Sequence, residues 1–131
     1  MRILIILIFA IVVPSLLMVS GCNPPKKVLE DNLRVTTDAV NNAEIPGANY
    51  DFSLTVESDM PPNGVKISIY VVGESDNLHY SPVPDIETSG KATPIHLSGL
   101  PLQQYAICNI KVTSKSNVAN SVNLSFRVIR K

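Results

Sequence analysis

The chain has 131 residues, with 11 basic and 11 acidic side chains, and its apolar residues are concentrated at one end: 16 lie among the first 21 residues and 43 among the other 110. Without the first 21 residues the net charge is near −1, and a chain with no basic excess is not expected to bind nucleic acid. The remaining 110 residues suffice for one domain but leave little room for a second lobe that would enclose an active-site cleft.

The first segment has the organisation of a secretory signal peptide. Met1-Arg2 gives a positively charged start, an apolar run covers residues 3–18, and small residues follow before Cys22. Pro14-Ser15 interrupts the run, which is shorter than the ~20 apolar residues that a membrane-spanning helix needs. The alternative is an uncleaved membrane anchor that ends in Gly-Cys by coincidence.

Val19, Ser20, Gly21 and Cys22 resemble the lipobox of bacterial lipoproteins, in which an aliphatic residue, a small residue and Gly or Ala precede the cysteine. The resemblance implies that a type II signal peptidase cleaves between Gly21 and Cys22. It also implies that Cys22 carries a diacylglycerol through a thioether bond and that fatty acids such as palmitate acylate its new amine. Two or three acyl chains hold a protein firmly on a bilayer, because each buried methylene contributes roughly 0.8 kcal/mol.

The residues after the cysteine bear on which membrane receives the protein. Lipoproteins of enteric-type bacteria stay in the inner membrane chiefly when Asp follows the cysteine, so Asn23 implies the outer membrane where the host has one. Surface export in some bacteria uses Lys followed by acidic residues, which Pro24-Pro25-Lys26-Lys27 matches poorly, and the side of the membrane stays open. Residues 22–31 are expected to form a lipidated tether, because the Pro pair favours an extended chain of about 3 Å per residue.

Residues 32–131 alternate apolar and polar side chains with the period of two that is typical of half-buried strands. No segment has the apolar spacing of a helix. Roughly seven short antiparallel strands in one domain predict an all-β fold, a β-sandwich rather than a barrel with long hairpins. We expect strands at 33–35, 50–56, 65–72, 78–81, 95–97, 105–114 and 122–128, and inward-facing side chains at Phe52, Leu54, Ile67, Ile69, Ile110, Val112, Leu124 and Phe126.

Leu100, Pro101 and Tyr105, followed by a strand, resemble the corner that introduces the sixth strand in fibronectin type III and immunoglobulin-like domains. In those domains the tyrosine hydroxyl bonds back to the backbone of the corner. The resemblance covers about residues 32–130, although the chain has no tryptophan. It implies that the third and sixth strands, at 65–72 and 105–114, lie side by side.

The second cysteine is predicted to be structural. If Cys22 carries lipid, Cys108 is the only thiol left and no intramolecular disulfide forms. Cys108 shares the inward register of Ile110 and Val112, so we expect a small buried side chain. A nucleophile, a metal ligand or an intermolecular bridge is the alternative, and each would need exposure and a charged partner.

Motifs for catalysis, metals or cofactors are not found in the sequence. His79 and His96 lack further ligands nearby, whereas zinc needs three or four, so no metal is expected. The acidic residues at 74–76 and 85–87 lack the ligand spacing and the glycine of a calcium loop. There is no glycine-rich phosphate loop, no Gly-x-Ser-x-Gly and no His-Glu-x-x-His. We therefore expect neither an enzyme nor a cofactor other than the lipid.

One surface is a candidate binding site. If 65–72 pairs antiparallel with 105–114, then Tyr70, Val72, Tyr105 and Ile107 share the outer face of the sheet, where polar residues are usual. Outward residues nearby would form a polar rim: Lys66, Ser68 and Asn109. The alternative is that the Pro-rich connection 80–86 folds over the four side chains and buries them.

The sequence therefore favours a lipid-anchored, monomeric protein of the bacterial cell envelope with a non-catalytic binding or spacer module. Its partner would be another envelope protein, a glycan or a host molecule. One alternative is an accessory subunit that anchors a larger secretion, adhesion or surface complex and contacts a bare sheet edge or the candidate patch. A remote alternative is a small hydrolase, which would need a cleft with paired carboxylates.

Overall fold

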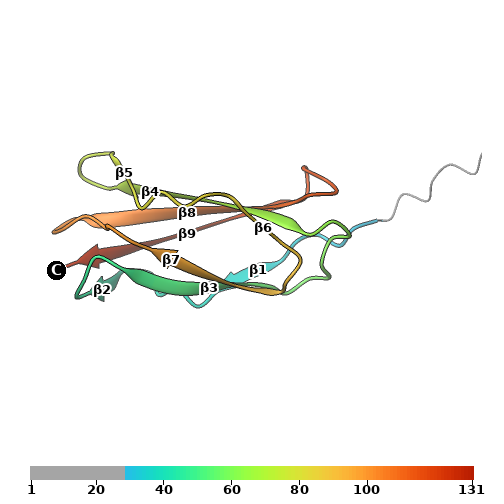
Figure 1. Cartoon of the computed structure of the whole chain (residues 1–131), viewed down its shortest axis with the longest axis horizontal. Coiled ribbons are helices and arrows are strands. Elements are labelled where there is room, and N and C mark those ends of the chain that lie inside the picture. Colours follow the sequence, from blue (N-terminus) through green and yellow to red (C-terminus); the bar gives the residue numbers. More distant parts are fainter. Residues whose placement is uncertain (1–28) are drawn as a thin grey trace, which may run out of the picture.

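The computed structural model describes residues 29–131, so the predicted signal peptide, Cys22 and most of the predicted tether lie outside the described residues. The described part consists of nine strands and no helix, and two sheets face each other as a β-sandwich, as predicted (Figure 1). The strands are β1 (Val35–Thr37), β2 (Ala43–Ile45), β3 (Tyr50–Val56), β4 (Val65–Gly73), β5 (His79–Tyr80), β6 (Ile86–Thr88), β7 (Ala92–Leu97), β8 (Tyr105–Ser114) and β9 (Ser121–Arg130).

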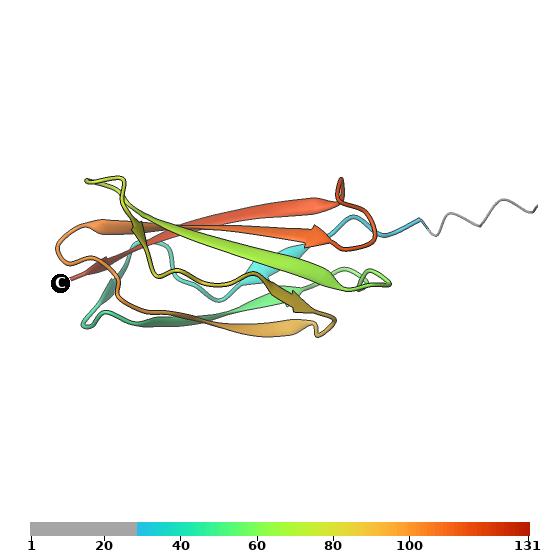
Figure 2. The ribbon, with the colours of Figure 1, turned by 45° about the horizontal axis from the view of Figure 1, so that its top comes forward.

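The two sheets differ in size. The smaller sheet has the order β1-β3-β7, and the larger sheet has the order β2-β9-β8-β4, with both β5 and β6 on the far side of β4. The long strands of both sheets run along the long axis of the domain (Figure 2). The chain changes sheets five times: from β1 to β2, from β2 to β3, from β3 to β4, from β6 to β7 and from β7 to β8. At each change, consecutive strands lie in opposite sheets and face the core from its two sides.

All seven predicted strands are present, and the structure adds two that the sequence did not predict, β2 and β6. Each has three residues, too few to show an alternating pattern. β2 also departs from the antiparallel arrangement that we predicted, because it pairs parallel with β9. The chain leaves the small sheet after β1 and turns at Asn42, whose φ is 62°, before it joins the large sheet.

The core lies between the two sheets and follows the predicted alternation. Seven of the eight side chains predicted to face inward are buried, and the eighth, Leu124, is partly buried and packs against the others. Phe52 of β3 and Phe126 of β9 meet edge to face across the sandwich, with ring centroids 4.9 Å apart. Leu97 and Leu100 are almost fully buried between the sheets.

The edges of the two sheets offer little free strand to a partner. The edge strand β7 contains Pro94, and the edge strand β2 ends just before Pro46. The segment between β5 and β6, along β4, carries Pro82 and Pro84. Proline has no N–H to donate, so it blocks the growth of a sheet at its position. The remaining edge strand, β1, has only three residues.

The domain is elongated, and the chain enters it and leaves it at opposite ends (Figure 1). We call the end where Leu29 lies the N-terminal pole and the other end the C-terminal pole. Asn120, in the turn between β8 and β9, accepts a hydrogen bond from the Leu33 amide at 2.9 Å. Its side-chain amide donates to the Asp31 carbonyl at 2.9 Å and to Glu30 Oε2 at 3.1 Å. The last residues of the segment expected to be a tether are thus attached to the sandwich.

Candidate functional site

The four candidate side chains lie on the outer face of the larger sheet. β4 and β8 pair antiparallel as predicted, with Val72 opposite Ile107 and Tyr70 opposite Asn109. Tyr105, at the start of β8, continues the same face two residues before Ile107. Tyr70 is 52 % exposed, whereas Val72, Tyr105 and Ile107 are partly buried. Tyr70 is therefore the most accessible of the four.

The connection from residue 80 to residue 86 does not cover this face. Tyr80 lies opposite Val71, and Ile86 lies opposite Ile67, so both follow β4 residues that point into the core. Val83 packs against the core as well. The apolar side chains of the connection thus seal the edge of the sandwich instead of burying Tyr70, and the covering loop that the sequence left open as an alternative is not formed.

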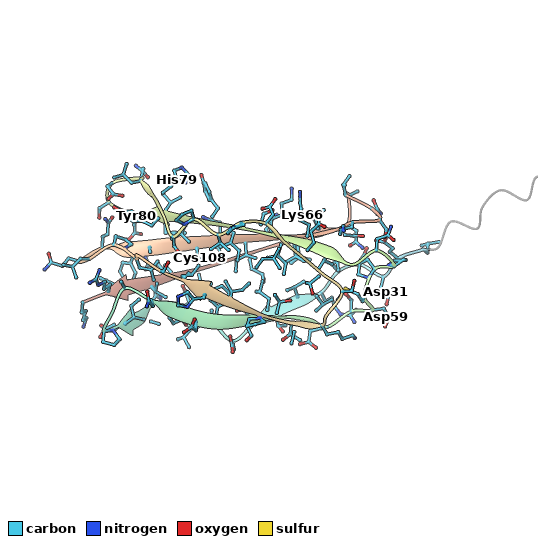
Figure 3. The ribbon with its side chains drawn as sticks, viewed as in Figure 1. Asp31, Asp59, Lys66, His79, Tyr80 and Cys108 are labelled. Atoms are coloured by element: carbon cyan, nitrogen blue, oxygen red, sulfur yellow. The ribbon has the colours of Figure 1, made fainter. Side chains whose placement is uncertain are left out.

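The registers of the neighbouring strands divide the outer face into two halves. Towards the C-terminal pole lies the apolar half, and Figure 3 places His79 near that pole and Lys66 nearer the N-terminal pole. Val72 forms a row with His79 of β5 on one side and with Ile107 and Arg127 on the other. The apolar half consists of Tyr70, Val72, Tyr105, Ile107 and Ile129, with His79 and Arg127 at the two ends of the Val72 row. The polar half consists of Lys66, Ser68, Asn109, Lys111, Thr113, Ser121, Asn123 and Ser125.

Aromatic and charged contacts fix the side chains of the apolar half. The Tyr70 and His79 rings meet edge to face with centroids 4.7 Å apart. The Arg127 guanidinium lies 4.3 Å from the centre of the Tyr105 ring, and its Nη1 donates to Glu74 at 3.0 Å. Such a cation–π contact contributes about 0.5–1 kcal/mol at an exposed site. These contacts limit the motion of both tyrosine rings.

Tyr105 does not take the position that the corner resemblance implied. Leu100 and Pro101 are buried at the turn, as in the resemblance, but the Tyr105 ring lies on the outer face under Arg127. Within residues 29–131 its hydroxyl makes no hydrogen bond to the backbone of the turn. The reason is the register: Ala106, not Tyr105, points into the core where β8 begins.

Two shallow hollows flank Tyr70. One, of about 380 Å³, lies on the polar half. The other, of about 320 Å³, lies between β4 and the connection at Ser81–Val83. Both are open to solvent, and Tyr70 forms part of each wall. The side chains that line the first hollow from the outer face are Ser68, Tyr70, Asn109, Lys111, Asn123 and Ser125, from three adjacent strands.

The histidines and acidic residues weighed as metal ligands make pairwise contacts with other side chains. Among residues 29–131 no three His, Cys, Asp or Glu side chains are close enough to hold a metal ion. His96 lies on the other sheet, where its Nδ1 is 2.5 Å from Asp51 Oδ1. The remaining pairs are Glu74 with Arg127, Asp76 with Tyr80, Asp85 with Lys66 and Glu87 with Lys115.

Asp76 fastens the tip of the β4–β5 hairpin to the turn before β8. Its carboxylate accepts hydrogen bonds from the Tyr80 hydroxyl at 2.5 Å, the Leu78 amide at 2.9 Å and the Gln104 side chain at 2.9 Å. These bonds, that from Tyr80 first, lower the pKa of Asp76 below its usual range. The same bond raises the pKa of Tyr80, because the phenol must keep its proton to donate it.

We expect Asp76→Asn to make the domain less sensitive to acid. A carboxyl with a lowered folded-state pKa contributes stability that is complete above its unfolded pKa, here near 3.8, and is lost as the pH falls through the folded-state value. Urea midpoints measured from pH 7 to pH 2 should therefore fall more steeply below about pH 4 for the unmodified chain than for Asp76→Asn. Asp59→Asn, an equal change of charge at an exposed residue, is the control, and identical pH profiles for all three proteins would contradict the assignment.

Cys108 is buried in the core, as the sequence predicted. It lies opposite Val71 on one side and Phe126 on the other, and it is 1 % exposed. Burial raises the pKa of the Cys108 thiol to about 12. Because the thiolate is the reactive form, the native protein should have an inert thiol at neutral pH.

A thiol reagent tests this prediction directly. In a Cys22→Ser variant, where Cys108 is the only cysteine, we expect no labelling of the native protein at pH 8 and complete labelling in urea. The labelling rate in urea is the control for reagent activity. Equally fast labelling without urea would show that Cys108 is exposed and reactive.

Comparison with known proteins adds no relative to this description. No family model matches the chain, and no curated protein matches it. Within residues 29–131 no helix is long and apolar enough to span a membrane.

Proposed function

We propose that the protein is a lipid-anchored module of the bacterial cell envelope that binds a partner, without catalysis, through the outer face of its larger sheet. The observation that carries this proposal is the exposure of Tyr70 beside Val72 and Ile107 on a sheet face. The exposed face of an antiparallel sheet is normally polar, and apolar side chains gathered on a surface are typical of an interaction site.

The lipobox at residues 19–22 supports the anchor, and the shape of the domain suits it. The described chain begins at the N-terminal pole, so a lipid on Cys22 would place that pole nearest the bilayer (Figure 1). The apolar half of the outer face lies towards the C-terminal pole, where His79 is found (Figure 3). A partner could then reach Tyr70 without competition from the membrane, which we propose is the outer membrane where the host has one.

The strand order supports an immunoglobulin-like or fibronectin type III-like module as the binding domain. In such sandwiches the third, sixth and seventh strands are neighbours in one sheet. Here β4, β8 and β9 are neighbours in that order, opposite a sheet made of β1, β3 and β7.

We expect Cys22→Ser to prevent lipid attachment and to release or mislocalise the protein. The substitution removes the sulfur that would bear the diacylglycerol, and without acyl chains no comparable attachment remains. Membrane fractionation and the mass of the N-terminal peptide measure the effect. Cys108→Ala, which alters the other cysteine and leaves the lipobox intact, is the matched control. A Cys22→Ser protein that stays in the membrane with its N-terminus at Met1 would contradict the anchor.

Site-specific photocrosslinking in intact cells tests the binding face. A photoreactive residue that inserts into C–H bonds of proteins and glycans alike would replace Tyr70 in one variant and His96, exposed on the other sheet, in the control. We expect a covalent adduct at position 70 and none at position 96. No adduct at position 70, or equal adducts at both positions, would overturn the proposal that this face binds a partner.

A further inference from the structure

We propose that the hollow on the polar half binds an acidic oligosaccharide, with one sugar ring against Tyr70 and a sugar carboxylate paired with Lys111. This inference rests on the proposed function and names the class of ligand for the same face. The hollow has a volume of about 380 Å³ and is open, which suits a ligand that lies along a surface. Three of its properties favour a saccharide: the aromatic wall, the polar floor and the charge.

The aromatic wall is the ring of Tyr70. It is half exposed, and it packs edge to face with the His79 ring of β5, which limits its rotation. A ring held in this way offers apolar contact area at a low cost in conformational entropy. The C–H groups on one side of a sugar ring form an apolar surface that can pack on such a ring. Tyr70 can therefore contact a sugar without burying the sugar's hydroxyl groups.

The polar floor consists of amides and hydroxyls on adjacent strands. Ser68 lies opposite Lys111, which lies opposite Asn123, and the next row places Asn109 opposite Ser125. Successive rows are about 6.8 Å apart along a strand, and neighbouring strands within a row are about 4.8 Å apart. Amides and hydroxyls both donate and accept hydrogen bonds, as sugar hydroxyls do. An apolar protein surface would leave these groups unpaired, so the floor favours a sugar over a protein.

The orientation of Asn109 adds donors to the floor. The Ser125 hydroxyl donates to Asn109 Oδ1 at 3.3 Å, which turns the oxygen of the amide towards β9. Within residues 29–131 no acceptor takes the Asn109 amide protons, so they remain for a ligand. Lys111, two residues later on the same face of β8, adds an ammonium group. Two neighbouring donors of this kind suit a carboxylate.

The charge of the hollow favours an acid. Lys111 is exposed, and among residues 29–131 it is the only charged side chain that lines the hollow. Lys66 and Arg127, which flank the hollow on the same face, have acidic partners at 3.9 Å and 3.0 Å. Lys111 has no such ion pair with any residue from 29 to 131. A cation without a neighbouring carboxylate complements an anionic ligand.

Calorimetric titration of the full chain in detergent tests the inference. The probes are oligosaccharides of uronic, sialic and muramic acid, each compared with its methyl ester, which keeps the ring and removes the charge. We expect at least one acid to bind saturably and its ester to bind at least ~10-fold more weakly. Raising the salt from about 50 mM to about 500 mM should weaken binding of the acid, because the ion pair is exposed.

Three variants separate the contribution of the Lys111 charge to binding from that of the Tyr70 ring. Lys111→Gln should weaken binding of the acid about 10-fold and leave the ester unchanged, whereas Tyr70→Ala should weaken both. Lys131→Gln makes the same change of charge at the C-terminus and should alter neither affinity. Circular dichroism of each variant checks that the fold is kept.

The inference is overturned if no acid in the panel binds, or if binding ignores both Lys111→Gln and Tyr70→Ala. It can fail while the proposed function stands. A protein crosslinked at position 70, together with no binding of any acid, would show that the face recognises a protein instead of a sugar. If neither crosslinking nor titration finds a ligand, both the inference and the proposed function are wrong.

Discussion

Replacement of Phe52 or Phe126 by Ala is expected to lower the free energy of unfolding by about 3–5 kcal/mol. The two side chains are 5 % and 4 % exposed, and their rings meet edge to face at the centre of the core. Removal of either ring loses its apolar burial and leaves a cavity that the two sheets can close only in part. A small domain has a total stability of about 5–15 kcal/mol, so either change should be visible in urea unfolding.

A control variant separates the loss of stability at the two buried phenylalanines from the effect of shortening any apolar side chain. Val118→Ala shortens an apolar side chain that is 79 % exposed, and it should change the stability by less than about 0.5 kcal/mol. The double variant of Phe52 and Phe126 should lose less than the sum of the two single losses, because the rings contact each other. Losses below about 1 kcal/mol at both phenylalanines would mean that the described register is wrong.

The long strands could be predicted because each buries one face. Residues 50–56 and 65–69 alternate strictly, and the structure buries Phe52, Leu54, Ile67 and Ile69 as the pattern requires. A shift of one residue would exchange the buried and exposed sides of a whole strand, so the pattern also fixes the register. Local alternation is thus sufficient to predict both the sandwich and most of its core.

Two short strands, β2 and β6, could not be predicted, because their pairing depends on the assembled fold. β2 and β6 have three residues each and gain their hydrogen bonds only beside β9 and β4. The parallel pairing of β2 follows from the path of the chain between the two sheets, which no pattern within residues 43–45 contains. Tertiary context, rather than local preference, decides such elements.

Only part of the outer face could be predicted from the sequence. Tyr70, Val72 and Ile107 could be brought together because the pairing of β4 with β8 was expected and is found. Arg127 and Ile129 were missed, since placing them needs the register of β9 against β8. The signal was present in the alternation of residues 122–128, whose apolar members face the core and leave Arg127 on the outer face. His79 lies on the strand predicted at 78–81, but it was not assigned to this face because the pairing of that strand with β4 was not predicted.

Gly64→Ala is the second change expected to have a large effect, with a loss of about 2–5 kcal/mol. Gly64 ends the turn that leads into β4, with a φ of +77°, and an L-residue there costs about 1–2 kcal/mol. An added Cβ would also lie 2.5 Å from the Thr88 carbonyl oxygen and 2.8 Å from Ser89 Oγ. The oxygen belongs to the backbone of β6, so relief requires a shift of a paired strand, which costs about 1–3 kcal/mol.

Two other glycines separate the contributions of backbone strain and steric conflict at Gly64. Gly99 has a φ of +66° with nothing within 4 Å of an added Cβ, so Gly99→Ala should cost only about 1–2 kcal/mol, from the backbone alone. Gly47 has open space and no positive φ, so Gly47→Ala should stay within about 0.5 kcal/mol of the unmodified chain. Urea unfolding of the three variants should therefore give losses that rise from Gly47 through Gly99 to Gly64. If Gly64→Ala lost no more stability than Gly99→Ala, β6 would not lie against the start of β4 as the structure has it, because the difference between them comes from that contact.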